Sequence, residues 1–421
     1  MNESKTLVAG SRIFIVGVGY VGLPLAIALA EAGFAVTGYD TNPSRVADLR
    51  QGRPGVETVS ARRLRRTLRA GTFVPTTKPA ALLDCEAVVI SVPTPIHADG
   101  TPDTSALESA ARLTVEGAQP GTLVVVESTS YPGTARTFFL PGLRHRLGRA
   151  GQDFYLASVP ERIDPGNRRY RLGTTPRLIG GVTPACGEMA RSLYEHVVPT
   201  CHVVSSPEVA EMAKLLENAF RNVNIALVSE LAILCEPAGI DVREVIRAAA
   251  TKPFGYMPFV PGIGVGGECI PVDPAYLTWY ARRKGLPMRT LERAIETNEA
   301  MPGHAVRRIE AALQRDGEEI AGARVLVLGV SYKPDVGDMR NSPALRVVVE
   351  LHRRGAVVAY HDPLVATLTV DDVQLVSQEL TEDVLRDAAI CVVLTAHKDF
   401  ELGRVQAFAR RYLNLAPVLE P

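Results

Sequence analysis

A glycine-rich turn near the N-terminus constrains the fold of this chain more than any other stretch. It reads Gly-Val-Gly-Tyr-Val-Gly from Gly17 to Gly22, directly after an apolar strand pattern at residues 12–16 and before an apolar helical run at residues 23–32. Glycines in this context allow a tight turn and let a pyrophosphate lie on the helix N-terminus, where unpaired N–H groups and the helix dipole favour anions. The sequence therefore predicts a Rossmann-type dinucleotide-binding domain at the start of the chain.

An acid at the end of the second predicted strand indicates which dinucleotide binds. That strand covers residues 35–39 and is followed by Asp40. A carboxylate about 20 residues past the glycines can accept hydrogen bonds from the adenosine ribose hydroxyls, and it would repel a 2′-phosphate. We therefore predict NAD rather than NADP. The predicted contacts in this region are the turn residues and the acid, namely Gly17, Gly19, Tyr20, Val21, Gly22 and Asp40.

Two further strand patterns, at residues 87–92 and 122–127, each end in a polar or proline-rich turn. Ligands of an open parallel sheet bind at the carboxyl ends of its strands, so we expect these turns to face the cofactor and substrate. Thr94 and Thr129 lie in them. Both threonines could instead cap the helices that follow, and the local sequence favours neither interpretation.

A second glycine-rich stretch carries a thiol and a carboxylate. Four of the six residues from 262 to 267 are glycine, and Cys269 and Asp273 follow. Such a run is a poor helix and a poor strand, so it predicts a loop that approaches a ligand closely. Cys269 could be a nucleophile with Asp273 as its base or orienting group, or it could be a packed cysteine in a tight turn.

The longest helical pattern covers residues 207–236 and combines apolar and polar faces. Apolar residues recur at three- and four-residue spacing, while Lys214, Asn218 and Asn222 fall on one face. Buried lysines are rare without a partner, so these polar groups favour a functional role. The alternative is that this face is simply solvated.

Strand patterns at residues 324–330, 356–362 and 389–395, with a helical pattern at 343–353, predict a second α/β unit. The turn at Gly329 lacks the full glycine fingerprint, so it is not an obvious second NAD site. Lys333 and Arg340 instead offer cations for phosphate groups.

Composition limits the remaining classes of function. The 421 residues have a formal net charge of +0 and are 46% hydrophobic, as expected for two or three globular domains. The arginine-rich run at residues 62–66 is typical of a solvated helix face, so we predict no nucleic-acid partner. We also predict no membrane span and no metal site. Six scattered cysteines and the absence of a signal-peptide pattern predict a cytoplasmic protein with reduced thiols.

These features, in this order over residues 10–400, resemble the nucleotide-sugar 6-dehydrogenases, the family that acts on UDP-glucose and UDP-N-acetylhexosamines. The most specific motif is Gly-Val-Gly-Gly-Glu-Cys-Ile-Pro-Val-Asp-Pro at residues 264–274. Segments 160–167, 258–262 and 332–343 look most like the UDP-N-acetylglucosamine enzymes. Pro165 stands where UDP-glucose enzymes usually carry a second glutamate, whereas UDP-N-acetylmannosamine enzymes share the Pro-Glu-Arg segment, so that sugar stays open.

The resemblance implies an α/β fold with two Rossmann-like domains joined by a long central helix. It implies an NAD domain at residues 1–205, a central dimerisation region with the cysteine loop at 206–315, and a UDP-binding domain at 316–421. It also implies a homodimer or higher homo-oligomer, with the site completed across the interface.

The resemblance further implies a four-electron oxidation of the sugar C6 alcohol to a carboxylate, using two NAD and one water. Cys269 would form a thiohemiacetal and then a thioester. Water held by Asp273 and Lys214 would act as the first base, and Lys214 with Asn218 would stabilise oxyanions. Glu161 would assist hydrolysis and Thr129 would position water, which completes the catalytic set Cys269, Lys214, Asn218, Asp273, Glu161 and Thr129.

The remaining predicted contacts complete the site. Cofactor contacts also include Arg45, Thr94 and Thr129. Predicted substrate contacts are Glu161, Arg162, Lys214, Asn218, Tyr256, Gly262, Gly266, Lys333 and Arg340. One departure from related N-acetylhexosamine enzymes is Glu268, where they often have histidine. A carboxylate beside the nucleophile disfavours the thiolate if the two side chains approach.

Two rival interpretations predict different chemistry. A single-step hydroxy-acid dehydrogenase would join a Rossmann domain to long helices and need a lysine base, but no thiol. A non-catalytic nucleotide-sugar binding protein would need neither thiol nor general base. The combination of Cys269, Lys214 and Glu161 favours the four-electron dehydrogenase over both.

Overall fold

The computed structural model describes residues 6–164, 167, 169–371 and 373–417. The chain divides into two compact units, residues 1–217 and 218–421.

The first unit is built on one eight-stranded sheet with the order β3-β2-β1-β4-β5-β6-β7-β8. Its strands are β1 (Arg12–Val16), β2 (Ala35–Tyr39), β3 (Phe73–Thr76), β4 (Ala87–Ile90), β5 (Leu123–Val126), β6 (Tyr155–Ser158), β7 (Arg177–Gly181) and β8 (Cys201–Val204). Every pair is parallel except β6 and β7. The chain order reverses at β1, which lies between β2 and β4, so the ligand-binding switch point is at its carboxyl end.

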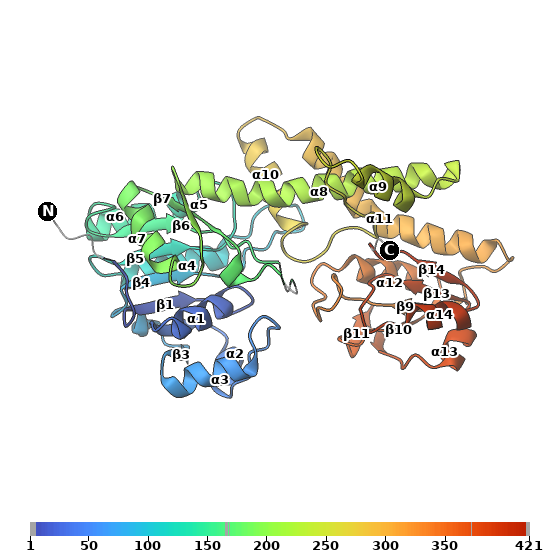
Figure 1. Ribbon diagram of the computed structural model, residues 1–421, viewed down its shortest axis with the longest axis horizontal. Helices are drawn as coiled ribbons and strands as arrows, with labels where there is room; N and C mark the ends of the chain where they lie inside the picture. The colour runs from blue at the N-terminus through green and yellow to red at the C-terminus, as the bar shows by residue number, and fades with distance from the viewer. Residues whose placement is uncertain (1–5, 165–166, 168, 372, 418–421) are drawn as a thin grey trace. The chain divides into compact units, whose positions relative to one another are not determined.

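Helices cover both faces of this sheet (Figure 1). Alternate strand residues point to opposite faces: Ile13 and Ile15 pack in one core, Phe14 and Val16 in the other. The first core includes α1 (Gly22–Glu31), α2 (Pro43–Arg50), α3 (Ala61–Ala70) and α7 (Pro184–Tyr194). The second includes η1 (Pro79–Leu82), α4 (Ser105–Gly117), α5 (Thr134–Phe138) and α6 (Leu140–Leu147), while η2 (Leu172–Thr174) lies between β6 and β7 along the chain.

The 32-residue helix α8 (Pro207–Ala238) runs from the first unit into the second. Gly239, with φ +67°, follows its end. The next helix, α9 (Val242–Ala250), begins after Asp241, whose carboxylate accepts a hydrogen bond from the Arg243 N–H at 2.9 Å. Asp241 therefore caps this helix.

The second unit contains a smaller parallel sheet with the order β10-β9-β13-β14. The strands are β9 (Arg324–Leu328), β10 (Val357–His361), β13 (Ile390–Val393) and β14 (Tyr412–Asn414). Helices α11 (Arg289–Gln314) and α12 (Pro343–Arg353) pack on one face; α13 (Glu382–Asp387) and α14 (Leu402–Phe408) pack on the other. Helix α10 (Val272–Arg283) follows the cysteine loop, and β11 (Thr367–Val370) pairs with β12 (Val373–Val376) as an antiparallel hairpin.

The predicted α/β class with two Rossmann-like sheets is confirmed. The sequence did not predict the antiparallel β6–β7 pair or the β11–β12 hairpin. The interpretation of Lys214, Asn218 and Asn222 as a solvated face is wrong, because all three are buried, at 7%, 6% and 1% exposed. No helix among the described residues is long and apolar enough to span a membrane.

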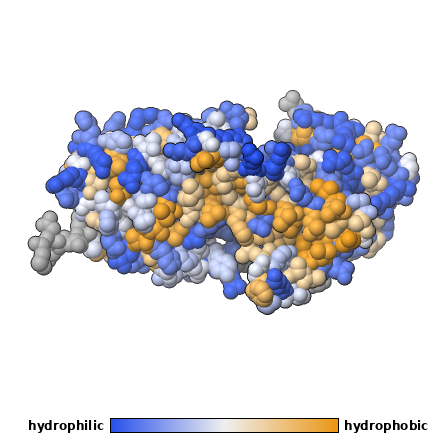
Figure 2. Space-filling view, turned by 90° about the horizontal axis from the view of Figure 1, so that it is seen from above, coloured by the Kyte–Doolittle hydropathy of each residue, from blue (hydrophilic) through white to orange (hydrophobic). Residues whose placement is uncertain are grey.

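Helix α8 instead exposes apolar side chains. Val209, Met212, Leu216, Phe220 and Leu227 recur at three-, four- and seven-residue spacing and are each more than a third exposed. Figure 2 shows apolar residues gathered on the face seen from above. A stripe of this spacing lies along one side of a helix, so the polar side of α8 is turned inward and an apolar side faces solvent.

Candidate active site

The glycine turn after β1 has the geometry of a dinucleotide cradle. Gly17 has φ +90°, and its N–H donates to the Tyr39 carbonyl at 2.8 Å. A Cβ at Gly17 would overlap the Ser91 carbonyl oxygen, and one at Gly22 would overlap the Gly17 carbonyl. At Gly19, by contrast, a Cβ would meet nothing within 4 Å, so this position opens toward the space where a ligand would approach.

Asp40, the acid after β2, is hydrogen-bonded to the same glycine turn. Asp40 accepts hydrogen bonds from the N–H groups of Val18 (3.3 Å) and Asn42 (3.0 Å). Arg45 donates to the Val18 carbonyl through Nε (3.0 Å) and Nη2 (2.8 Å), and to the Pro54 carbonyl at 2.5 Å. The open glycine, the helix N-terminus and the acid together fit NAD. Arg45 fixes the turn itself, and its predicted cofactor contact stays a prediction.

The turns after β4 and β5 are joined by their threonines. The Thr94 hydroxyl donates to the Thr129 carbonyl at 2.6 Å. The capping interpretation is wrong for both, because α4 begins after Thr104 and α5 after Gly133. Both threonines therefore lie at the carboxyl edge of the parallel strands, where the sheet binds ligands.

Glu161, in the segment after β6, is held on both carboxylate oxygens. Oε1 accepts from the N–H groups of Arg162 (2.6 Å) and Ile163 (2.7 Å), while Oε2 pairs with Nη2 of Arg177 at 2.5 Å. Glu161 is 8% exposed, so this pairing is shielded from solvent. Arg162 forms an ion pair with Glu217 at 2.6 Å. Pro165 and Gly166, which the sequence comparison used, lie outside the described residues.

In the second unit, the cysteine loop presents an exposed thiol. Cys269 is exposed, so the packed-cysteine interpretation is wrong, and all six cysteines are free thiols. The Asp273 N–H donates to the Cys269 carbonyl at 2.9 Å, which places the two residues one helical turn apart. Asp273 is 3% exposed, and its Oδ2 accepts from Nδ2 of Asn218 at 2.5 Å.

Further amides fasten the loop to the helices. Nδ2 of Asn222, one turn beyond Asn218 on α8, donates to the Ile270 carbonyl at 3.2 Å. Nδ2 of Asn298 on α11 donates to the Asn222 carbonyl at 3.0 Å. Lys214 lies one turn before Asn218 on the same helix. The polar side of α8 thus supplies the amides that hold the segment between Cys269 and Asp273.

The glycines of the loop pack against the segment that follows β9. The Gly267 N–H donates to the Arg340 carbonyl at 3.0 Å, and its carbonyl accepts from Asn341 at 3.1 Å. A Cβ at Gly266 would lie 2.7 Å from Cβ of Tyr332, and one at Gly267 2.9 Å from the Tyr332 ring. Glycine is required at both positions because the Tyr332 side chain occupies the adjacent space.

Glu268, which directly precedes Cys269, is paired with a cation. Nη1 of Arg340 lies 2.5 Å from Glu268, and its Nη2 lies 2.6 Å from Asp338. Burial would lower the pKa of Arg340, but the hydrogen bond to Asp338 and the charges of Glu268 and Asp338 outweigh burial and raise it. Arg340 therefore offsets the negative charge next to Cys269. A second role for Arg340 in phosphate binding stays a prediction.

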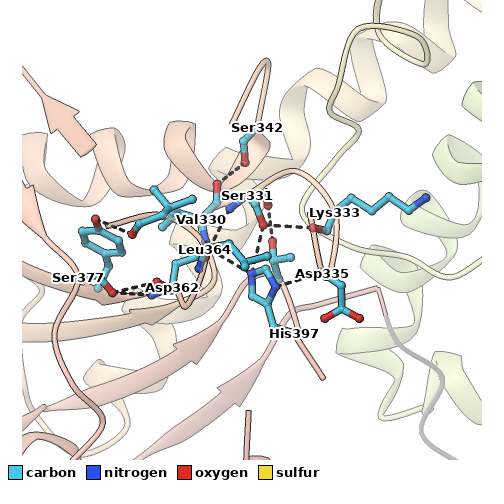
Figure 3. A network of polar contacts seen from close by, with 12 residues as sticks. Val330, Ser331, Lys333, Asp335, Ser342, Asp362, Leu364, Ser377 and His397 are labelled. Carbon is cyan, nitrogen blue, oxygen red and sulfur yellow. Dashed lines mark hydrogen bonds and ion pairs between the residues drawn. The ribbon is translucent and has the colours of Figure 1, made fainter. Parts of the chain in front are cut away.

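A buried polar network fixes the segment that carries Lys333 and Arg340 (Figure 3). Asp362, after β10, accepts from the Val330 N–H at 2.8 Å and from Nε2 of His397 at 3.1 Å. Nδ1 of His397 accepts from the Asp335 N–H at 3.0 Å, so its Nε2 carries the proton. The sequence did not indicate either residue, although Asp362 directly follows β10 and His397 comes four residues after β13, at the ligand-binding edge of a parallel sheet.

The other predicted substrate residues of the second unit, Tyr256, Gly262 and Lys333, lie in separate segments of the chain. Tyr256 is 38% exposed. A Cβ at Gly262 would lie 3.1 Å from Pro417. Lys333 extends from the loop after β9 (Figure 3). Their contacts to a substrate stay predictions, as do those of Arg162 and Gly266.

Comparison with known proteins identifies the family. Residues 11–198 match the NAD-binding domain of the UDP-glucose/GDP-mannose dehydrogenase family, residues 208–300 its central domain and residues 326–418 its UDP-binding domain. The chain therefore belongs to this family of NAD-dependent oxidoreductases.

Individual relatives cover most of the chain. The UDP-N-acetyl-D-glucosamine 6-dehydrogenase of Pseudomonas aeruginosa is 36% identical over 84% of this chain and 83% of its own. The UDP-N-acetyl-D-mannosamine dehydrogenase of Pyrococcus horikoshii is 36% identical over 93% and 90%. A solved structure of the UDP-N-acetylmannosamine dehydrogenase from Pyrococcus horikoshii superimposes with a TM-score of 0.86, covering 97% of this chain and 96% of that one at 33% identity.

The Asp362 network makes stability depend on pH. Burial would raise the pKa of Asp362, but hydrogen bonds from His397 and from the Val330 and Leu364 N–H groups outweigh it and lower the pKa. A lowered folded pKa adds stability above about pH 4, and this stability is lost as pH falls through the folded pKa. Asp362→Asn should lose about 1–3 kcal/mol of unfolding free energy at pH 7. Urea titrations at pH 7 and pH 3.5 measure this loss, which should shrink at the lower pH; an equal loss at both would contradict the assignment.

The Arg340–Glu268 pair should control thiol reactivity. Arg340→Gln leaves Glu268 uncompensated beside Cys269, which disfavours the thiolate that reacts with iodoacetamide. We expect alkylation of Cys269 to slow several-fold at pH 7.5, corresponding to the ~1 kcal/mol of one nearby charge in a wet site. The double variant Arg340→Gln/Glu268→Gln should regain the wild-type rate. Peptide mass spectrometry of Cys269 follows the rates, and identical rates in all three proteins would show that Glu268 does not reach the thiol.

Proposed function

We propose that this enzyme oxidises the C6 alcohol of UDP-N-acetylglucosamine to the carboxylate in two NAD-dependent steps. The observation that carries the proposal is the exposed Cys269, with Asp273 one turn further and hydrogen-bonded to Asn218 of α8. A thiol in this position suits a covalent intermediate, which mere binding or a single oxidation does not need. The Pseudomonas aeruginosa relative supports the N-acetylglucosamine derivative; the Pyrococcus horikoshii relative keeps N-acetylmannosamine as the alternative sugar.

The cofactor would be held in the first unit. The residues proposed to hold it are Gly17, Gly19, Tyr20, Val21, Gly22, Asp40, Arg45, Thr94 and Thr129. NAD, when bound, supplies the hydride acceptor for each of the two oxidations. The chain orients it through the helix N-terminus at α1 and the carboxylate of Asp40.

The second unit and the polar side of α8 would supply the covalent chemistry. Water held by Asp273 and Lys214 takes the proton of the C6 hydroxyl in the first oxidation. The Cys269 sulfur then bonds to the aldehyde carbon, and the resulting hydroxyl makes the adduct a thiohemiacetal. Oxidation of this adduct leaves a thioester at Cys269. The Lys214 ammonium and the Asn218 amide stabilise the oxygen that carries negative charge in these steps.

Hydrolysis would complete the reaction. Water adds to the thioester carbon, the carbon–sulfur bond breaks, and Cys269 leaves as a thiolate while the sugar acid is released. Glu161 accepts a hydrogen bond from the attacking water, and Thr129 helps to position it. Lys333, Arg340, Tyr256, Gly262, Gly266 and Arg162 are the proposed contacts to the UDP-sugar.

We also propose domain limits and an assembly. The limits are residues 1–205 for NAD binding, 206–315 for the central region and 316–421 for UDP binding. The exposed apolar stripe of α8 supports a homodimer built around this helix, because large apolar side chains on one helix side favour association. Analytical ultracentrifugation of Leu216→Glu against the wild type tests this assembly.

The ratio of NADH formed to sugar consumed tests the reaction. UDP-N-acetylglucosamine should yield two NADH per molecule because a thioester intermediate carries the aldehyde to the acid. UDP-N-acetylmannosamine and UDP-glucose, assayed in parallel, should be oxidised more slowly. Absorbance at the NADH band, with chromatography of the sugar product, measures both quantities.

Cys269→Ser is the matched control, because it keeps a hydroxyl in place of the thiol. This variant should bind NAD as the wild type does but fail in the second oxidation. Full four-electron turnover by Cys269→Ser would overturn the nucleophile assignment. One NADH per sugar in the wild type would favour the single-step dehydrogenase.

Asp40 provides a separate test of the cofactor site. Asp40→Ala removes an acceptor for the ribose hydroxyls and loosens Val18, so NAD affinity should fall about tenfold, equivalent to 1.4 kcal/mol. UDP-sugar affinity should not change. Isothermal titration calorimetry measures the NAD affinity. The control is Asp84→Ala, which changes an exposed aspartate of the same unit. Equal NAD affinities of the two variants would contradict the proposed contact of Asp40.

A further inference from the structure

The first unit buries a cluster of charged groups behind Glu161. Arg177 begins β7, Glu127 follows β5 and Tyr194 ends α7. Arg177 and Glu127 are each 1% exposed and Tyr194 is fully buried, so the cluster is shielded from water. A charge in such a place is costly unless it is paired, which makes the choice of partners informative.

One guanidinium serves two carboxylates in this cluster. Nη2 of Arg177 lies 2.5 Å from Oε2 of Glu161 and 3.7 Å from Oε1 of Glu127. The Tyr194 hydroxyl donates to the same Glu127 oxygen at 2.8 Å. Nη1 of Arg177 donates to the Pro160 carbonyl at 3.5 Å. Arg177 is therefore directed at Glu161, with Glu127 as the more distant competitor.

The pairing separates the roles of the two glutamates. Burial raises the pKa of Glu127 to about 7; the charge of Glu161 adds to the rise, and Arg177 and the Tyr194 hydroxyl oppose it. The groups that act on Glu127 thus come from β7, α7 and the segment after β6. Glu161, by contrast, accepts from two backbone N–H groups and from Arg177. Three donors therefore fix the positions of its two carboxylate oxygens.

We propose that Arg177 and Glu127 are positioning residues for thioester hydrolysis: Arg177 fixes the orientation of the Glu161 carboxylate, and the charge of Glu127 sets how tightly Arg177 holds it. This inference rests on the proposed function and deepens its final step. A carboxylate fixed on both oxygens keeps lone pairs that can accept a hydrogen bond from a water molecule. It cannot swing away, because the Arg162 and Ile163 N–H groups and Arg177 hold both ends.

The Glu127 charge gives this step a direction of pH dependence. When Glu127 ionises, the guanidinium is shared between two negative groups, so its hold on Glu161 weakens and Glu161 becomes a stronger acceptor. Hydrolysis should therefore accelerate as pH rises through about 7. Glu127→Gln keeps an acceptor for Tyr194 but has no charge to gain, so its hydrolysis rate should stay at the low-pH level across this range.

Rapid-mixing measurements isolate the step. Both oxidations precede hydrolysis, so a variant that is slow only in hydrolysis should release a burst of up to two NADH per site and then turn over slowly. Arg177→Lys and Glu127→Gln should each show this burst, with steady-state kcat reduced at least tenfold at pH 8 and the NAD affinity unchanged. Acid quenching and mass spectrometry should find the sugar acid as a thioester on Cys269.

Arg191→Lys, on the exposed side of α7, is the matched control and should behave as the wild type. The proposal is overturned if both variants keep the wild-type hydrolysis rate and pH profile, or if they fold and bind NAD but lose the burst itself. If Arg177→Lys does not fold, Glu127→Gln decides through its pH profile. If the wild type forms no NADH from any of the three UDP-sugars, the proposed function and this inference fail together. If the wild type is active, the variants test this inference alone.

Discussion

The arrangement of the candidate active site depends on the hydrogen bonds between α8 and the cysteine loop. A segment with four glycines in six residues loses much conformational entropy when it is ordered, so its own chain supplies little to hold it. Asn222 binds the Ile270 carbonyl just before α10, and Asn218 binds Asp273 within the first turn of α10. Each of these buried amides would be costly without its partner, and each contact contributes about 1 kcal/mol when satisfied. The polar side of α8 therefore orders the cysteine loop, and the loop in turn satisfies the buried amides of α8.

The segment after β9 supports the same loop from its other side. Gly267 exchanges backbone and side-chain hydrogen bonds with Arg340 and Asn341, and Arg340 neutralises Glu268. The buried pair of Asp362 and His397 anchors this segment to the carboxyl edge of the second sheet (Figure 3). The charge of Glu268 beside Cys269 is therefore compensated by a residue 72 positions away in sequence. The second sheet therefore shapes the cysteine loop.

Local patterns were enough to predict the elements that depend on local physics. The turn at Gly17, the strand before Asp40 and the length of α8 follow from steric needs and periodicity, and the structure confirms them. The inward side of α8 could not be predicted, because apolar spacing indicates a side but not whether a protein core or solvent lies next to it. Arg177 was missed because it begins an otherwise apolar strand pattern. Its partners Glu127 and Glu161 lie beyond the ends of β5 and β6, and the sequence alone does not bring them together.

Helix α8 buries polar side chains and exposes apolar ones, and this arrangement affects the stability of the candidate site. The turn of the helix that buries Lys214 and Asn218 also exposes Leu216, which is 63% exposed, and the next turns expose Phe220 and Leu227. Burying a side chain of this kind contributes about 1.5–3 kcal/mol, so a protein surface that covered the stripe would stabilise the helix. The buried amides and the exposed apolar stripe belong to the same helix. Any rotation of α8 that buried the stripe would therefore also move the amides away from Asp273 and Ile270. A second copy of the chain on this stripe, as proposed above, would therefore stabilise the same helix orientation that holds the cysteine loop.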